Sequence, residues 1–325
     1  MIARILRALL VLQLLAVAAL YLLVHRFWHA ASAGVALLLA VALVLLARAL
    51  ITANNFGLSW HFRSATPPQH RPRPWRRCRM FFEEFGATML GSSWTMAWPR
   101  VARHIAPDAV GPPVLLIHGY GCNGGYWTQL SALLRQAHVS HDAIDLEPVA
   151  APIDDYVPLV RCALESLRTA SGSERVIIVA HSMGGLVARA YLRVHGSAHI
   201  ARVITLGTPH HGTRLASFGV GRNAAQMRCS AADAGGWLIT LAGGESGSRR
   251  ALFTSLFSHH DNIIAPQTSC HLPGAKNIEF GGIGHVALGS NRRILLCVLD
   301  EVRRASGSGV RAEQRDGDAL APPRN

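Results

Sequence analysis

The sequence has almost no lysine: Lys276 is the only one among its 32 basic residues, and the others are arginine. Acidic residues are also few, 19 in all, so the 325-residue chain carries a formal net charge of +13. Proteins that bind nucleic acid place basic residues on a recognisable motif with stacking aromatics, and the sequence has no such motif. Genome composition alone can produce an arginine- and alanine-rich chain, so we predict no nucleic-acid partner.

The six cysteines have no C-x-x-C spacing, which excludes a zinc ribbon and a dense disulfide scaffold. Cys229 and Cys270 could pair only if the domain faces an oxidising compartment. Neighbouring histidines raise the question of a metal, at His210, His211, His259 and His260. Adjacent side chains point apart in most backbones, so we predict no metal site at these histidines. We also predict no cofactor and no obligate protein partner.

Two long apolar runs lie near the start of the chain, at residues 5–24 and 30–47. Each approaches the roughly 20 apolar residues that cross a bilayer as a helix. The short segment HRFWH between them carries aromatics of the kind found at membrane interfaces. The sequence therefore predicts a transmembrane hairpin over residues 1–51.

A cleaved signal peptide or a single anchor stays open as an alternative, because residues 31–33 read A-S-A, like a cleavage site. The charges predict the orientation. Arginines precede the first run and follow the second, whereas the turn carries only Arg26. The positive-inside rule then puts both ends and the following domain in the cytoplasm of a bacterium, at its inner membrane.

Residues 52–79 form a predicted basic linker, rich in Pro, Arg and His. Its stretch QHRPRPWRRCR (69–79) is predicted to contact anionic lipid headgroups, and a merely solvated linker is the alternative.

From residue 113, apolar strands alternate with amphipathic helices, after a predicted helix at 80–98. Continuous apolar strands separated by helices indicate a mostly parallel sheet covered by helices on both faces. We therefore predict a single α/β domain over residues 80–304, followed by a disordered tail at 305–325.

The segment 208–250 is longer than a simple crossover between two strands requires and contains glycine-rich patches. Long insertions of this kind often cover a binding site. A lid and an ordinary decorated crossover are both compatible with the sequence.

Ser182 lies in VIIVAHSMGG (176–185), between a predicted strand and a predicted helix. A sharp turn there exposes the hydroxyl at the carboxyl edge of the sheet and aims helix N–H groups at developing negative charge. The positions two before and two after the serine must be small, and Ala180 and Gly184 meet this requirement. We predict that Ser182 is a nucleophile.

A serine nucleophile needs a base and an acid. His285 and Asp261 each follow a predicted strand, so both lie where open α/β sheets bind ligands. We predict that His285 is the general base and acid and that Asp261 orients it. The rival acids precede the serine, and the last two fit helix caps: Asp145, Asp154 and Asp155.

An oxyanion needs two N–H donors. The residue after the nucleophile, Met183, supplies one backbone N–H, and Tyr120 in the early loop LLIHGYG (115–121) supplies the second. His118 and Gly119 are predicted to shape this loop rather than to move protons.

Five motifs carry a resemblance to a known family: HGYG (118–121), AHSMGG (180–185), GTPHHGT (207–213), HDNIIAP (260–266) and GIGHVAL (282–288). Together they resemble bacterial lipases and esterases of the α/β-hydrolase fold. The A-x-S-x-G turn resembles that of small Bacillus-type lipases, and GTPHHGT is similar to a loop of larger lipases and of the PGAP1-like group. The resemblance implies hydrolysis of carboxylic esters through an acyl-serine.

The predicted function is therefore a membrane-anchored serine esterase or lipase that acts on acyl or lipid esters. A thioesterase or acyltransferase would use the same acyl-serine, and a catalytically silent scaffold would keep only the fold. The sequence alone leaves these alternatives open.

Overall fold

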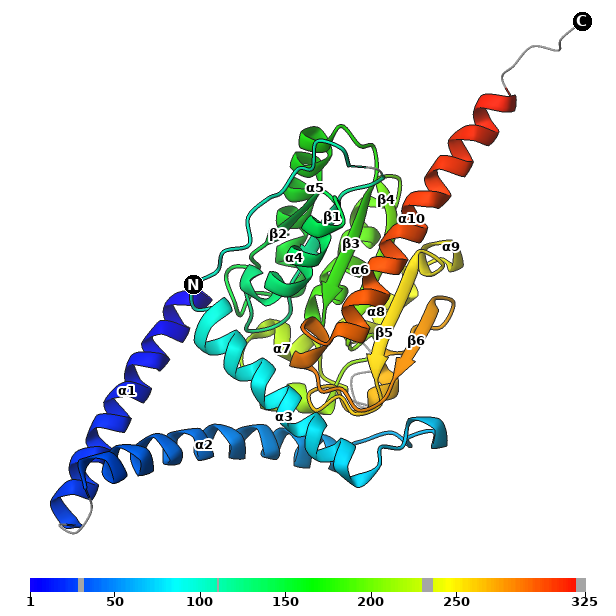
Figure 1. Cartoon of the computed structure of the whole chain (residues 1–325). Coiled ribbons are helices and arrows are strands. Elements are labelled where there is room, and N and C mark those ends of the chain that lie inside the picture. The colour runs from blue at the N-terminus through cyan, green and yellow to red at the C-terminus, as the bar shows by residue number, and fades with distance from the viewer. Residues whose placement is uncertain (29–31, 110, 230–235, 320–325) are drawn as a thin grey trace, which may run out of the picture.

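A six-stranded sheet forms the centre of the molecule (Figure 1). The computed structural model describes residues 1–28, 32–109, 111–229 and 236–319, with side chains up to residue 307. The strands run in the order β2-β1-β3-β4-β5-β6, and every neighbouring pair is parallel. They are β1 (Val114–Ile117), β2 (His141–Ile144), β3 (Val176–His181), β4 (Ile200–Leu206), β5 (Phe253–Ser258) and β6 (Lys276–Phe280).

Helices cover both faces of this sheet. α5 (Val157–Ser171) and α6 (Met183–His195) lie on one face, and α4 (Thr128–Gln136) and α10 (Arg292–Ala319) lie on the other. Successive residues of β3 point to opposite faces, so Ile178 packs against α5 and α6 while Ile177 packs toward α4 and α10. Burial on both faces explains the continuous apolar strands, and the predicted α/β-hydrolase architecture is confirmed.

Short helices fill the connections. The segment between β4 and β5 contains four of them, and its residues 230–235 lie outside the described part of the chain. These four are η5 (Arg214–Phe218), α7 (Arg222–Gln226), α8 (Trp237–Gly243) and α9 (Gly247–Arg250). The others are η1 (Pro68–His70), η3 (Gly124–Trp127), η4 (Ile153–Tyr156), η6 (Gln267–Cys270) and η7 (Val286–Gly289).

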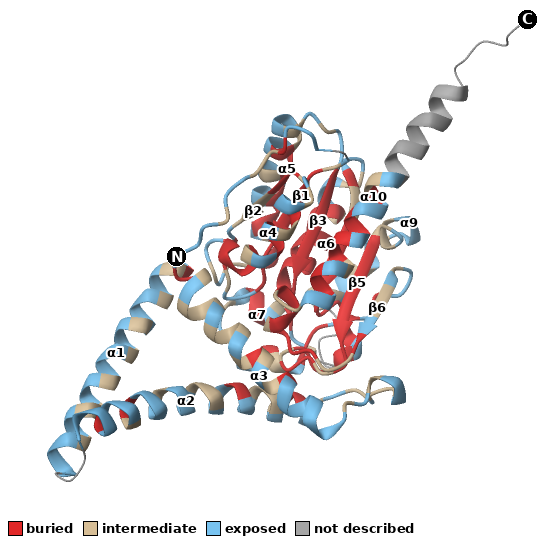
Figure 2. Cartoon of the chain, in the orientation of Figure 1, coloured by how far each residue is buried: buried red, intermediate tan, exposed pale blue. Residues whose placement is uncertain are grey.

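Two long apolar helices, α1 (Ile2–Phe27) and α2 (Ala33–His61), project from the α/β domain as a V (Figure 1). Both are long and apolar enough to cross a membrane, and exposed residues run along most of their length (Figure 2). Both open ends of the V contact the domain. The Met1 amino group pairs with Glu147, and Ser59 near the end of α2 donates a hydrogen bond to a backbone carbonyl at residue 261.

The predicted linker is shorter than expected, because helices occupy both of its ends. α2 continues to His61, where Ser59 is buried against the domain. The helix expected at 80–98 starts earlier, as α3 (Pro74–Leu90), and passes into the π-helical turn η2 (Gly91–Thr95). The fixed φ of Pro74 suits the first turn of a helix. A contact with the domain therefore accompanies the end of α2, whereas a local sequence signal accompanies the start of α3.

The C-terminal segment also differs from the expected disordered tail. α10 continues to Ala319; residues 320–325 lie outside the described part of the chain. All six cysteines are free, Cys229 and Cys270 included. The cleavage-like triplet begins at residue 31, also outside the described part.

Candidate active site

Ser182 occupies the strained turn between β3 and α6. Its φ and ψ are 52° and −125°, a conformation that non-glycine residues rarely adopt and that tends to mark functional sites. The Ser182 N–H donates to the Leu206 carbonyl oxygen at 2.8 Å, which ties the turn to the end of the neighbouring strand β4. The Thr208 hydroxyl donates to the Ser182 carbonyl oxygen at 2.9 Å. The surrounding strands therefore stabilise the strained serine.

Small residues make this turn possible. A Cβ atom on Gly184 would lie 2.5 Å from the Ile117 carbonyl oxygen and 2.6 Å from that of His118. Ala180, on the other side of the turn, is fully buried. The first helical turn of α6 therefore packs directly on the end of β1. This close packing is the physical reason why positions 180 and 184 must hold small residues.

His285 and Asp261 form a buried pair at the same end of the sheet. His285 Nδ1 donates a hydrogen bond to Asp261 Oδ2 at 2.7 Å, and Asp261 is completely shielded from solvent. Asp261 Oδ1 accepts the N–H groups of Ile263 at 2.8 Å and Ile264 at 2.7 Å, which fixes the carboxylate plane. Burial alone would lower the pKa of His285, but the charge and hydrogen bond of Asp261 raise that pKa above its usual value.

The end of β4 joins the serine to this pair. A Cβ atom on Gly207 would lie 3.1 Å from Asp261 Oδ2 and 3.2 Å from His285 Nδ1. Gly207 directly follows Leu206, whose carbonyl oxygen accepts the hydrogen bond from the Ser182 N–H. The structure thus brings Ser182, His285 and Asp261 together at the carboxyl edge of the sheet.

The loop after β1 lies against the serine. A Cβ atom on Gly119 would lie 2.8 Å from Ser182 Cβ. Buried His118 accepts the Leu146 N–H through Nε2 at 2.9 Å, so its Nδ1 carries the proton and donates to the Gly119 carbonyl oxygen. Burial lowers the pKa of His118, and this neutral histidine braces the loop. The Tyr120 hydroxyl donates to Val220 in the 208–250 segment at 2.7 Å.

Sequence reasoning missed Glu84. This glutamate on α3 is 1% exposed and accepts the N–H groups of Val286 at 3.0 Å and Ala287 at 2.9 Å, directly after His285. Burial raises the pKa of Glu84. One signal was available in the sequence, because helical spacing puts Glu84 on the same buried face as Met80.

His181 was also missed, although it precedes the nucleophile. Its ring stacks on Tyr126 at 4.2 Å between centroids and lies 4.6 Å from the His285 ring. Its Nε2 donates to the His285 carbonyl oxygen at 3.3 Å, and burial holds its pKa well below the usual value. His181 is therefore neutral and packs between the Tyr126 ring and the loop that carries His285.

Two of the three rival acids, Asp145 and Asp154, have other partners. Asp145 accepts the Gly124 N–H at 2.7 Å. Asp154 accepts hydrogen bonds from Arg193 at 2.7 Å and from the Trp237 indole at 2.6 Å, so it links two segments and does not cap α5 as expected. Neither carboxylate is hydrogen-bonded to His285.

A second serine–histidine pair has a different position. The Ser131 hydroxyl lies 2.8 Å from His141 Nε2, and both residues are buried. His141 is the first residue of β2. In a parallel sheet this is the amino edge, opposite the edge that carries Ser182, so the pair braces α4 against β2.

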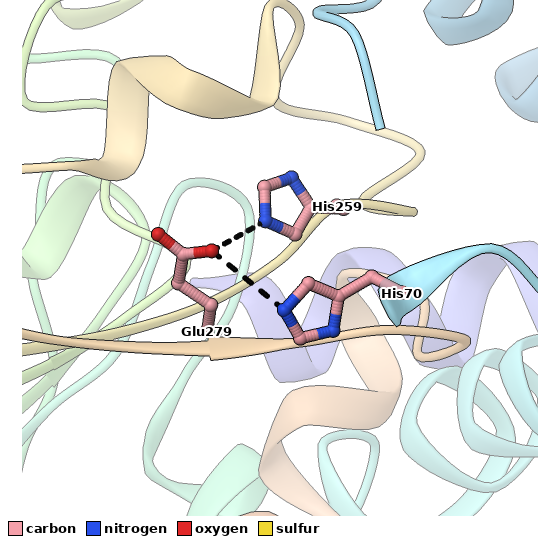
Figure 3. A group of neighbouring side chains, drawn as sticks. All are labelled: His70, His259 and Glu279. Atoms are coloured by element: carbon pink, nitrogen blue, oxygen red, sulfur yellow. Dashed lines mark hydrogen bonds and ion pairs between the residues drawn. The ribbon is translucent and has the colours of Figure 1, made fainter. Parts of the chain in front are cut away.

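One group of side chains in the described residues combines metal-ligand types: His70, His259 and Glu279 (Figure 3). Glu279 Oε2 lies 2.8 Å from His259 Nε2 and 3.7 Å from His70 Nε2, and the two imidazole rings stack at 4.9 Å. Metal-bound histidines normally donate their other N–H to a partner, whereas His259 Nδ1 is buried without one. As arranged, His259 is hydrogen-bonded to Glu279 at the sheet edge, and His70 of the linker packs on this pair by ring stacking. His210, His211 and His260 are not part of it.

The parallel sheet, the strained serine turn and the buried histidine–aspartate pair together define an α/β-hydrolase. The sequence profile of the alpha/beta hydrolase family matches residues 114–278, and the chain belongs to this family.

Solved structures with a similar fold include a lipase of Bacillus licheniformis, BlEst2. Its mature form is 18% identical, with a TM-score of 0.52 over 62% of this chain and 96% of that one. Its propeptide form is likewise 18% identical, with a TM-score of 0.51 over 62% of this chain and 52% of that one. Lipase B of Aspergillus fumigatus is 21% identical, with a TM-score of 0.48 over 60% and 54%. At these identities the likeness concerns the fold.

Proposed function

We propose that this chain is a membrane-anchored serine hydrolase that cleaves carboxylic esters of acyl or lipid substrates. The observation that carries the proposal is the strained Ser182 at the strand edge that also holds the 2.7 Å hydrogen bond between His285 and Asp261. The lipase structures of similar fold support the ester class.

The reaction follows from this arrangement. Ser182 Oγ attacks the ester carbonyl while His285 Nε2 takes the hydroxyl proton, and Asp261 stabilises the resulting imidazolium. The backbone N–H groups of Tyr120 and Met183 donate to the tetrahedral oxyanion. The C–O bond then breaks, His285 protonates the departing alcohol, and an acyl-serine remains. Water attacks this ester by the same steps and releases the carboxylic acid.

Labelling with a fluorophosphonate tests the nucleophile. The reagent should phosphonylate the activated hydroxyl, and mass spectrometry of the digested full-length protein should find the adduct on Ser182. Ser131 is the internal comparison, because its hydroxyl also contacts a histidine but lies at the amino edge of the sheet. An adduct on Ser131, or on no serine, would contradict the proposal; the latter would favour the silent scaffold.

The substrate class needs a separate comparison. The rate of hydrolysis should be measured with p-nitrophenyl esters of graded acyl-chain length. A rate that rises with chain length supports a lipase. Faster cleavage of thioesters, or transfer of the acyl group to an added alcohol, would assign the same acyl-serine to a thioesterase or acyltransferase.

The membrane part of the proposal rests on the V of α1 and α2. Both open ends of the V contact the α/β domain, as expected of a hairpin that leaves and re-enters on one side of a bilayer. Arginines at these ends favour the cytoplasmic side, and we propose the inner membrane of a bacterium as the location.

Reporter fusions at the C-terminus test this orientation. We expect alkaline phosphatase to be inactive and a cytoplasmic fluorescent reporter to be bright. An active phosphatase fusion would contradict the cytoplasmic orientation and favour the alternative of a cleaved signal or a single anchor. Recovery of the protein free of membranes would contradict the anchor itself.

A further inference from the structure

A cavity of about 590 Å³ lies where α2 leaves its apolar stretch and meets the linker, α3 and the loop after β5. Its volume falls within the range of small-ligand sites. The cavity wall includes aromatic and aliphatic side chains from α2 and α3: Ala53, Phe56, Trp60, Met80 and Phe81. Neither Ser182 nor His285 lines it, so the cavity is separate from the candidate active site.

Three arginines line the same cavity: Arg63, Arg71 and Arg77. Within the described part of the chain, none of the three forms an ion pair with an acidic side chain. The Arg63 guanidinium lies 3.3 Å from the Trp60 ring centroid, and that of Arg77 lies 6.0 Å from it, so the Trp60 ring is within cation–π range of two like charges. Positive charges held together without an acidic partner favour an anionic ligand.

Two histidines line the cavity, His259 and His260, and His260 adds no charge. Burial above all, followed by the nearby His259 and Arg77, lowers the pKa of His260 to about 4, so it is neutral at physiological pH. His260 Nδ1 accepts the Gly282 N–H at 3.0 Å. The three arginines therefore supply positive charge to the cavity that does not depend on histidine protonation.

We propose that this cavity binds an anionic membrane phospholipid, with the phosphate against the three arginines and the proximal acyl chain against the apolar wall. The position on α2 selects this ligand, because Ala53, Phe56 and Trp60 follow directly on the membrane-length apolar stretch and so lie at headgroup level. The inference rests on the proposed membrane location and not on the proposed ester hydrolysis.

Two side chains of the cavity wall are hydrogen-bonded to the backbone of Asp261 in the candidate active site. Ser59 Oγ donates to the Asp261 carbonyl oxygen at 3.0 Å, and Gln267 Nε2 donates to the same oxygen at 2.9 Å. Ser59 and Gln267 both line the cavity. A bound lipid therefore contacts the side chains that fix the backbone of the Asp261 loop.

The test uses the full chain as the Ser182→Ala variant, which removes turnover, in phosphatidylcholine nanodiscs. Phosphatidylglycerol brominated on its acyl chains quenches tryptophan on contact, and the difference from a Trp60→Phe variant isolates the signal of Trp60. Brominated phosphatidylcholine is the neutral comparison, and a brominated fatty acid represents the other anionic amphiphile. The pocket variant changes Arg63, Arg71 and Arg77 to Gln, and the matched control changes Arg73, Arg76 and Arg79 to Gln.

We expect saturable quenching of Trp60 by phosphatidylglycerol. Each arginine near the surface contributes about 1 kcal/mol, or roughly a fivefold change in affinity, so the pocket variant should bind at least about tenfold more weakly than the control variant. A triple Arg→Lys variant of the pocket should keep the binding, which separates charge loss from misfolding. Equal weakening in pocket and control variants would overturn the site, and so would equal quenching by phosphatidylcholine. Quenching by the fatty acid alone would overturn the assignment to a membrane lipid.

Discussion

Replacement of Ser182 by alanine should lower kcat for short p-nitrophenyl esters by a factor on the order of 10⁶. The change removes the attacking oxygen, so no acyl-serine can form, and the remaining rate comes only from substrate binding and the oxyanion donors. Steady-state kinetics of the detergent-solubilised full chain measure the effect. KM should change little, because the hydroxyl contributes little to ground-state binding.

Ser131→Ala is the matched control for this result. It also removes a buried hydroxyl that contacts a histidine, but at the edge of the sheet where no substrate is expected. We expect kcat to remain within a few-fold and only the melting temperature to fall, since a buried His141 nitrogen loses its partner. A loss of turnover in Ser131→Ala with normal activity in Ser182→Ala would move the nucleophile to the other pair.

The sheet could be predicted from the sequence because strands such as VIIVA (176–180) are apolar without interruption. This pattern is typical of parallel strands that helices cover on both faces. The same reasoning put Ser182, Asp261 and His285 at one edge, since each follows a strand of that sheet. The pattern could not show how the residues around them are fixed. The Glu84 contact with the loop after His285 joins residues about two hundred positions apart, and helical periodicity reveals only that Glu84 is buried.

The segments near the membrane were harder to predict for a different reason. Residues 52–61 and 74–79 contain polar and basic residues that are compatible with helix or linker, and contacts such as Ser59 with the Asp261 carbonyl decide between them. The cavity with its three arginines arises from the same contacts. The basic stretch 69–79 was recognised as a lipid-facing candidate, but the selection of Arg71 and Arg77 from it, and their combination with Arg63 outside it, require the fold.

Replacement of Asp261 by asparagine should lower kcat by a factor on the order of 10⁴. The two N–H groups of Ile263 and Ile264 already hold one carboxylate oxygen, so an asparagine will keep its carbonyl oxygen there. Its NH₂ group then faces His285 Nδ1 and donates to it. His285 must carry its proton on Nε2 instead, where it can no longer accept the proton of Ser182.

The pH profile separates this mechanism from simple misfolding. His285 acts as a base only when neutral, so kcat/KM falls as the pH drops through its pKa, which Asp261 holds above the usual histidine value. In Asp261→Asn the charge that raises this pKa is lost while burial remains. The acid limb of the kcat/KM profile, where kcat/KM falls with decreasing pH, should therefore move to lower pH along with the loss of rate. Asp145→Asn is the control, because Asp145 contacts Gly124 and not His285, and it should leave both the rate and the limb unchanged. A normal rate in Asp261→Asn with an unmoved limb would show that another carboxylate orients His285.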